Sequence, residues 1–131
     1  MNKLKLAESY VKVTDMDKSV LFYEELLQVK SIVRYKDRWT TIVDGFGSYR
    51  PTFDQENNIE MTTIEPRLVT GNNTIIVFHS TDIEKDYQRI KNMEIGEISN
   101  IADINLMAHY RFFHFKDRDG NMIEIGQYFD N

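Results

Sequence analysis

The sequence predicts an α+β protein made of two tandem β-α-β-β-β modules, about residues 1–66 and 67–131 of a single domain spanning residues 1–131. An internal repeat carries this prediction. The segments Thr14-Asp15-Met16-Asp17-Lys18 and Thr81-Asp82-Ile83-Glu84-Lys85 share the order Thr, Asp, apolar, acid, Lys at a separation of 67 residues. A strand-like stretch precedes each aspartate, and a helical pattern with three further strand-like runs follows it. Both halves therefore have the same order of elements.

In the first module, residues 8–13 have the pattern of a strand and lead to Asp15, where we expect a helix to begin. Aspartate is a preferred N-cap residue, because its carboxylate accepts a backbone N–H at the positive end of the helix dipole. The helix is indicated by apolar residues at spacings of three and four, namely Val20, Tyr23, Leu26 and Leu27. Strands are then expected over residues 29–35, 38–43 and 46–50.

The second module repeats this order with a strand over residues 75–80 and a helix capped by Asp82, whose apolar positions are Ile83, Tyr87, Ile90 and Met93. Strands follow over residues 95–104, 111–116 and 122–127, and a tight turn at Asp119-Gly120-Asn121 joins the last two. The polar stretch over residues 53–73 exceeds the typical connection of about 4–6 residues. Within it, residues 59–64 alternate well enough to form a strand of their own.

Composition narrows the class of protein. With 41% hydrophobic and 28% charged residues, the chain has the composition of a compact globular protein. It contains no cysteine, which excludes disulfides, thiolate metal sites and a cysteine nucleophile, and which fits a cytoplasmic location. The net charge is −5 and the 16 basic residues are scattered, so we expect no nucleic-acid partner. No apolar run approaches the ~18–20 residues of a membrane span.

Two segments resemble a known superfamily. Residues 13–27 are similar to its strand-to-helix segment with Phe22-Tyr23, and Asp117-Arg118-Asp119-Gly120-Asn121 resembles its closing Asp-Pro-Asp-Gly-Asn hairpin, with Arg118 where proline is usual. This is the vicinal oxygen chelate superfamily of glyoxalase I, bleomycin-resistance proteins, extradiol dioxygenases and fosfomycin-modifying enzymes. The resemblance implies an eight-stranded, incompletely closed, glyoxalase-like barrel with a pocket on its concave side and helices outside. We also expect a homodimer.

In metal-dependent members of that superfamily, the ligands come from the first and last strands of each module. The resemblance assigns Glu8, Ile75 and Glu124 to such places, with Glu60 as the counterpart of Glu124 in the first module. A site of Glu8, Glu60 and Glu124 would suit magnesium, manganese or calcium. Because Ile75 cannot bind a metal, we expect no metal and no other cofactor. The carboxylates could instead bind a cation, accept hydrogen bonds from tyrosine or arginine, or transfer protons.

Histidines and aromatic residues complete the candidate site. Among the three histidines, His109 is favoured for ligand contact, His79 shares the side-chain parity of Ile75, and His114 has the surroundings of a hydrogen-bonded structural residue. Aromatic side chains on alternate strand positions could face the cavity or pack in the core or an interface. The predicted ligand-binding residues are Glu8, Tyr10, Trp39, Tyr49, His109, Tyr110 and Glu124, with Tyr128 following Glu124 on the last strand.

These residues favour a glyoxalase/bleomycin-resistance-like protein that binds a small organic molecule, aromatic or cationic, without a conventional metal centre. The alternative is a divalent-metal-dependent lyase, isomerase or dioxygenase of the same superfamily that uses Glu8 and Glu124. A third possibility is a pure binding module that sequesters a toxic compound. Ile75 argues against the enzyme and Glu124 argues for it, so catalysis stays open at this point.

Overall fold

A computed structural model describes residues 3–50, 74–105 and 107–129. The chain divides into two compact units, residues 1–70 and 71–131, and each is described by itself. The strand expected over residues 59–64, and Glu60 within it, lie outside the described residues.

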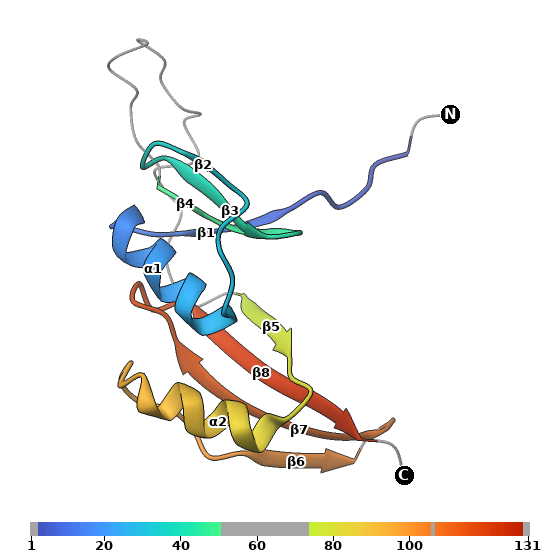
Figure 1. Ribbon diagram of the computed structural model, residues 1–131. Helices are drawn as coiled ribbons and strands as arrows, with labels where there is room; N and C mark the ends of the chain where they lie inside the picture. Colours follow the sequence, from blue (N-terminus) through green and yellow to red (C-terminus); the bar gives the residue numbers. More distant parts are fainter. Residues whose placement is uncertain (1–2, 51–73, 106, 130–131) are drawn as a thin grey trace. The chain divides into compact units, whose positions relative to one another are not determined.

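The first unit is a four-stranded sheet with one helix on it (Figure 1). Its elements are β1 (Ser9–Lys12), α1 (Met16–Leu27), β2 (Val33–Tyr35), β3 (Trp39–Val43) and β4 (Phe46–Tyr49). The strand order is β1-β4-β3-β2. β1 runs parallel to β4, and the other neighbours are antiparallel.

The second unit has the same topology. Its elements are β5 (Ile75–His79), α2 (Ile83–Asn92), β6 (Ala102–Asn105), β7 (His109–Lys116) and β8 (Met122–Phe129). The strand order is β5-β8-β7-β6, with β5 parallel to β8 (Figure 1). The first strand of each unit thus pairs with the last, and the predicted repeat of two β-α-β-β-β units is confirmed.

Both helices begin where the sequence predicts. Asp15 caps α1 and accepts a hydrogen bond from the backbone N–H of Lys18 at 3.1 Å. Asp82 caps α2 and accepts the equivalent bond from the N–H of Lys85 at 3.2 Å. The repeated motif is therefore a repeated N-cap.

Two strands are shorter than predicted. The strand expected over residues 29–35 is reduced to β2, because Gln28 ends α1 in the left-handed conformation at φ 56° and the carboxylate of Glu24 accepts the N–H of Ser31 at 2.8 Å. These contacts hold the connection in a non-extended path. The strand expected over residues 95–104 is reduced to β6, preceded by an isolated bridge between Ile98 and Phe115.

Each core lies between the helix and one face of its sheet. In the first unit the ring of Tyr23, 0% exposed, meets the ring of Phe46 edge-on at 5.1 Å. In the second unit Phe113, 0% exposed, meets Tyr87 edge-on at 4.9 Å. Since neighbouring residues of a strand point to opposite sides, these contacts identify the helix side of each sheet, and we call the opposite side its far face.

The hairpin between β7 and β8 closes at the predicted turn. The buried carboxylate of Asp117 accepts the backbone N–H groups of Asp119 and Asn121, both at 2.9 Å, and the side-chain amide of Asn121. Gly120 has a φ of 86°, a conformation that glycine adopts without strain. The turn therefore fixes the register of β7 against β8, which decides the face that each side chain reaches.

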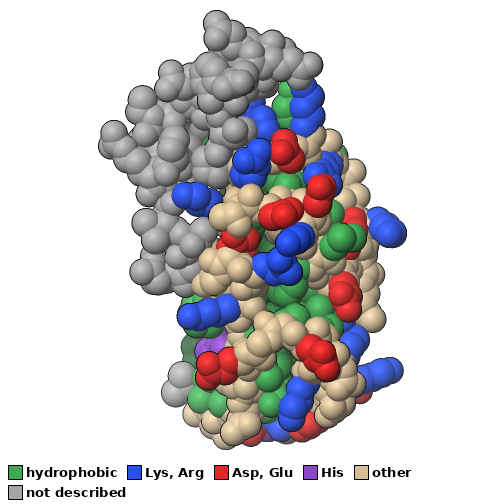
Figure 2. All heavy atoms as spheres, turned by 90° about the vertical axis from the view of Figure 1, so that its left-hand side faces the viewer, with side chains coloured by type: hydrophobic (Ala, Val, Ile, Leu, Met, Phe, Trp, Pro, Cys, Tyr) green, Lys and Arg blue, Asp and Glu red, His purple; other side chains and the backbone are tan. Residues whose placement is uncertain are grey.

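Figure 2 shows basic and acidic side chains interspersed over the visible face of the molecule. Neither α1 nor α2, the helices of the described residues, is long and apolar enough to cross a membrane.

Candidate functional site

Strand alternation gathers most of the predicted site residues on the far faces of the two sheets. On β1, β3 and β4, the register aligns Tyr10 with Gly47 and Trp39 with Tyr49. On β7 and β8, it aligns His114 with Glu124 and Tyr110 with Tyr128. Phe46 and Phe113 mark the helix sides, so these alternate positions belong to the far faces.

Four aromatic rings lie together on the far face of the first sheet. The ring of Tyr10 is tilted against the rings of Trp39 and Tyr49, with centroid distances of 6.5 Å and 6.2 Å. The ring of Tyr35 stacks on the other side of Trp39 at 6.4 Å. Tyr49 is buried, whereas Tyr10 is 47% exposed. The structure thus brings Tyr10, Trp39 and Tyr49 into one aromatic group.

Glu8 adds a carboxylate beside this group. Burial and the neighbouring carboxylate of Glu8 raise the pKa of the Tyr10 hydroxyl. The Oε1 atom of Glu8 is buried and has no hydrogen-bond partner among the described residues. A buried carboxylate oxygen without a donor is costly, so this atom is ready to accept a bond or a cation. We call Glu8, Tyr10, Trp39 and Tyr49 the aromatic–carboxylate group.

A hydrogen-bonded cluster lies on the far face of the second sheet. The hydroxyl of Tyr110 donates to Oε2 of Glu124 at 2.7 Å, and Nε2 of His114 lies 2.8 Å from Oε1 of the same carboxylate. Burial first, and then the carboxylate of Glu124, raise the pKa of Tyr110 well above its ordinary range. The side chain of Glu124 is 16% exposed and that of His114 34% exposed. The cluster is therefore reachable from outside.

Gly126 makes room for this cluster. A Cβ atom at residue 126 would lie 1.7 Å from the hydroxyl oxygen of Tyr110, which shows that the tyrosine lies directly over the glycine. Around it, the ring of His79 meets the rings of Tyr110 and Tyr128 at 6.1 Å and 5.5 Å. The absence of a side chain at residue 126 allows Tyr110 to reach Glu124.

His109 lies on the other side of the second sheet. It is on the helix side, where its Nε2 lies 2.7 Å from Oδ1 of Asp103 and where Arg111 contacts the same carboxylate at 3.3 Å. Hydrogen bonding to His109 is the main cause that lowers the pKa of Asp103. The structure therefore does not bring His109, the histidine favoured by the sequence, to the face that carries Glu124.

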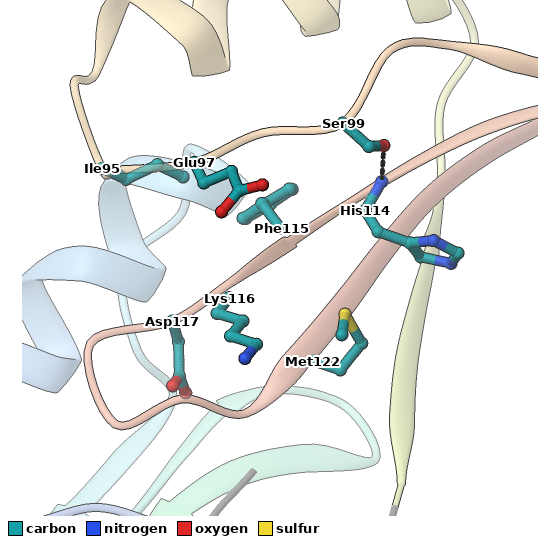
Figure 3. A pocket seen from close by; sticks show the side chains of 8 residues that line it. All are labelled: Ile95, Glu97, Ser99, His114, Phe115, Lys116, Asp117 and Met122. Carbon is teal, nitrogen blue, oxygen red and sulfur yellow. Dashed lines mark hydrogen bonds between the residues drawn. The ribbon is translucent and has the colours of Figure 1, made fainter. Parts of the chain in front are cut away.

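A cleft of about 390 Å³ opens in the second unit beside His114 (Figure 3). Its walls include Ile95 and Glu97, on the segment that leads to β6, together with Lys116 and Met122 from β7 and β8. The backbone N–H of His114 donates to Oγ of Ser99 at 2.8 Å, the contact marked in Figure 3. Ser99, on the segment before β6, thus holds β7 beside the cleft, beyond the part of β7 that pairs with β6.

Sequence reasoning predicts that His114 is hydrogen-bonded, as it is, but does not pair it with Glu124 and does not single out Lys116. The signal was present in the hairpin, because a tight turn around Asp119 and Gly120 aligns Lys116 with Met122 and, two residues further, His114 with Glu124. Counting outward from that turn would have paired the histidine with the glutamate.

The register also tests the metal-ligand places that the resemblance implies. Tyr10 and Val77 both stand five residues before their N-cap aspartates, and they pair with Gly47 and Glu124. Gly47 is therefore the counterpart of Glu124, and a Cβ atom there would lie 1.9 Å from the backbone oxygen of Thr40. Of the four places, Glu8 and Glu124 are carboxylates, whereas Gly47 and Ile75 offer no ligand atom on a side chain. This donor set fits a resident metal poorly.

Solved structures with the same fold are numerous. A protein from the mobile metagenome of V. pseudocholerae matches with a TM-score of 0.72 and 18% identity over 99% of this chain and 98% of that one. Lactoylglutathione lyase from Agrobacterium tumefaciens matches with a TM-score of 0.69 and 15% identity over 97% and 96%. An antibiotic-binding protein from Streptomyces matches with a TM-score of 0.63 and 16% identity over 98% and 99%.

The duplicated topology and these likenesses define a glyoxalase-type fold, as the sequence predicts. The chain belongs to the Glyoxalase/Bleomycin resistance protein/Dioxygenase superfamily, whose family model matches residues 6–125. No curated protein sequence matches the chain significantly.

Proposed function

We propose that this protein binds a small organic molecule, aromatic or cationic, without a conventional metal centre. The aromatic–carboxylate group carries the proposal. It combines the ring of Tyr10, which is half exposed, with the neighbouring rings of Trp39 and Tyr49 and with the buried, unpartnered Oε1 of Glu8. Rings tilted against one another and a carboxylate beside them are what an organic cation needs for recognition.

The energetics favour a cation with an apolar body. A cation over an aromatic ring gains about 0.5–1 kcal/mol at an exposed place and about 2 kcal/mol or more where water is excluded. A positively charged donor would also satisfy Oε1 of Glu8, whose lack of a partner among the described residues costs about 1–3 kcal/mol. A neutral aromatic ligand would gain the stacking alone and should bind more weakly.

The metal-free form of the proposal is supported by the second module as well as the first. Both oxygens of Glu124 already accept hydrogen bonds from Tyr110 and His114, and the matching place in the first module is Gly47. A metal-dependent lyase, isomerase or dioxygenase would have to draw its ligands from Glu8 and Glu124 with no side-chain donor at residues 47 and 75. We therefore favour binding over metal-dependent catalysis.

The superfamily contains proteins whose role is binding. The Streptomyces protein with this fold binds an antibiotic, and we propose a comparable kind of ligand, a small organic compound, for this chain. The homodimer and the cytoplasmic location that the sequence predicts are part of the same proposal.

Trp39 is the one tryptophan of the chain, so its fluorescence reports on the aromatic–carboxylate group. We expect basic aromatic compounds to change this fluorescence and to raise the melting temperature more than anionic compounds of similar size. At one hundred times the Kd, mass action adds about 2.7 kcal/mol to the free energy of unfolding. The measurement is a thermal-shift screen followed by a fluorescence titration.

Two variants separate binding from general charge effects. Glu8→Gln and Asp44→Asn each remove one negative charge from the first unit, but Asp44 is exposed in the turn between β3 and β4. We expect Glu8→Gln to weaken binding of organic cations about tenfold or more, consistent with losing a charge-assisted contact. Asp44→Asn should leave binding unchanged. Equal effects of both variants, or a preference for anions, would refute the proposal.

A further inference from the structure

Glu8 distinguishes between two kinds of organic cation. An aromatic face attracts any positive charge, whether or not the cation has a hydrogen on its nitrogen. A carboxylate oxygen accepts hydrogen bonds, so it also needs an N–H or O–H donor. The Oε1 atom of Glu8 is buried and has no hydrogen-bond partner among the described residues. This atom therefore lacks a donor, which a positive charge alone does not supply.

The neighbouring side chains of the aromatic–carboxylate group do not supply that donor. Burial and the carboxylate of Glu8 raise the pKa of the Tyr10 hydroxyl, but this hydroxyl makes no hydrogen bond to Oε1. Gly47, which pairs with Tyr10 on the adjacent strand, has no side chain that could donate. A bound molecule with its own N–H would satisfy the buried oxygen.

The space beside Oε1 of Glu8 is small. A Cβ atom at residue 47 would lie 3.2 Å from Oε1 and 1.9 Å from the backbone oxygen of Thr40, so the carboxylate lies close to the backbone of β4. A charged N–H brings its nitrogen to about 2.7–2.9 Å from a carboxylate oxygen. A methyl group approaches an oxygen only to about 3.3–3.6 Å. A nitrogen covered by methyl groups is therefore kept away from Oε1, whereas an N–H is not.

The carboxylate and the rings lie close enough to bind one small molecule. Glu8 precedes Tyr10 by two residues, and its carboxylate acts directly on the Tyr10 hydroxyl. The ring of Tyr10 in turn lies 6.5 Å from the ring of Trp39 and 6.2 Å from that of Tyr49. Tyr10 is also the half-exposed member of the group, so a ligand ring reaches it from outside. An amine joined to an aromatic ring by a short chain can contact both parts.

We propose that the ligand of the aromatic–carboxylate group is a protonated arylalkylamine, whose N–H donates a hydrogen bond to Oε1 of Glu8 while its ring packs against Tyr10. This inference rests on the proposed function, because it names the class of cation that the same group binds. One N–H is sufficient, since one buried oxygen lacks a donor. Quaternary ammonium compounds carry the same charge without an N–H and cannot make this contact.

Stepwise N-methylation of phenethylamine tests the need for an N–H, because the positive charge stays constant while the hydrogens are replaced one by one. The primary, secondary and tertiary amines are protonated at neutral pH, and each keeps at least one N–H. We expect their dissociation constants to agree within about threefold, and that of the quaternary compound to be about tenfold higher or more. The fluorescence of Trp39, excited where the probes do not absorb, measures all four dissociation constants.

Glu8→Met removes the acceptor and keeps a side chain of similar length, so this variant should bind the tertiary and quaternary compounds about equally. Asp44→Asn is the matched control, because it removes an exposed carboxylate from the turn between β3 and β4 and should keep the full difference. The wild-type series decides the question even if Glu8→Met does not fold. Equal binding of all four compounds, a gradual change with each methyl group, or a difference that persists in Glu8→Met would overturn the inference.

Phenethyl alcohol, which has the same ring without a charge, separates a failure of this inference from a failure of the proposed function. We expect the three amines with an N–H to bind more tightly than the alcohol. If all four ammonium compounds bind equally well and more tightly than the alcohol, the group binds cations through charge and rings alone, and the need for an N–H is wrong. If no ammonium compound binds more tightly than the alcohol, both proposals are wrong.

Discussion

Glu124 is the centre of the hydrogen-bonded cluster in the second unit, because it accepts a hydrogen bond from Tyr110 and another from His114. The hydrogen bond from Tyr110 lies in a partly buried place, and this explains why the hydroxyl holds its proton so strongly. A proton held more strongly in the folded chain than in the unfolded one links folding to pH. The free energy of unfolding at alkaline pH therefore reports on the contact between Tyr110 and Glu124.

We expect stability to fall as pH rises above about 10, the ordinary pKa of tyrosine. In that range the unfolded chain releases the Tyr110 proton while the folded chain keeps it, so unfolding becomes easier with each step in pH. The Tyr110→Phe variant should be about 1–2 kcal/mol less stable than the wild type at neutral pH. It should then lose less stability as the pH rises. Urea unfolding between about pH 8 and pH 11 measures both slopes; parallel curves would contradict the assignment.

Single residues also show where sequence reasoning succeeds and fails. The alternation of side chains along each strand predicts that Tyr10, Trp39 and Tyr49 share one face of the sheet, and the structure brings them together there. His109 and His114 have opposite parity on β7, so only one of them can share a face with Glu124. The choice between them depends on the register across the hairpin, which is obtained by counting outward from the turn at Asp119 and Gly120 and not from composition.

At the scale of elements, both helices are stabilised by the same local contact, an N-cap aspartate. Asp15→Ala and Asp82→Ala should each lower the free energy of unfolding by about 1 kcal/mol, because each removes the acceptor for an N–H of the first turn. Asp15→Asn and Asp82→Asn keep an acceptor and should cost only a few tenths of that. Chemical denaturation measures these differences. Asparagine variants as unstable as the alanine variants would refute the capping role.

The elements that the sequence predicts best are those with local causes. An N-cap aspartate and apolar spacing act within one turn, so the helix starts could be predicted to the residue. The ends of β2 and β6 depend on contacts made after folding, such as the bond between Glu24 and the N–H of Ser31. No pattern within residues 29–32 indicates that bond, and the predicted strand was therefore too long.

At the scale of the whole molecule, the homodimer is the prediction with the clearest test. Leu4 and Leu6 are exposed just before β1, an edge strand, and burying a leucine gains about 1.5–3 kcal/mol. We expect a dimer in sedimentation experiments. The double variant Leu4→Ser, Leu6→Ser should raise the dissociation constant about a hundredfold or more.

Leu21→Ser is the control for the dimer, because Leu21 is also exposed but lies on α1. It should leave the dissociation constant unchanged. A wild-type monomer at micromolar concentration would contradict the prediction outright, and an equal effect of Leu21→Ser would move the interface away from the segment before β1.

The duplication explains why the fold was predictable and the chemistry less so. The repeated motif around Asp15 and Asp82 already implies two equivalent units, and the topology agrees. The two units differ at the candidate site, since Gly47 stands in one and Glu124 in the other. The equivalence of Gly47 and Glu124 is seen from the pairing of the strands and not from their separation in the sequence. Apolar neighbours in the sequence favour Glu60 as the counterpart, whereas strand pairing gives Gly47 the place equivalent to Glu124.

The close approach of Tyr110 to Gly126 constrains the order in which this surface can evolve. Any side chain gained at residue 126 would collide with the tyrosine ring, with 2.2 Å between the new Cβ and Cζ. A side chain at position 126 therefore requires the Tyr110 ring to move from its place over the glycine or to be shortened. We expect relatives with a larger residue at position 126 either to carry a smaller residue at position 110 or to hold that side chain away from Glu124.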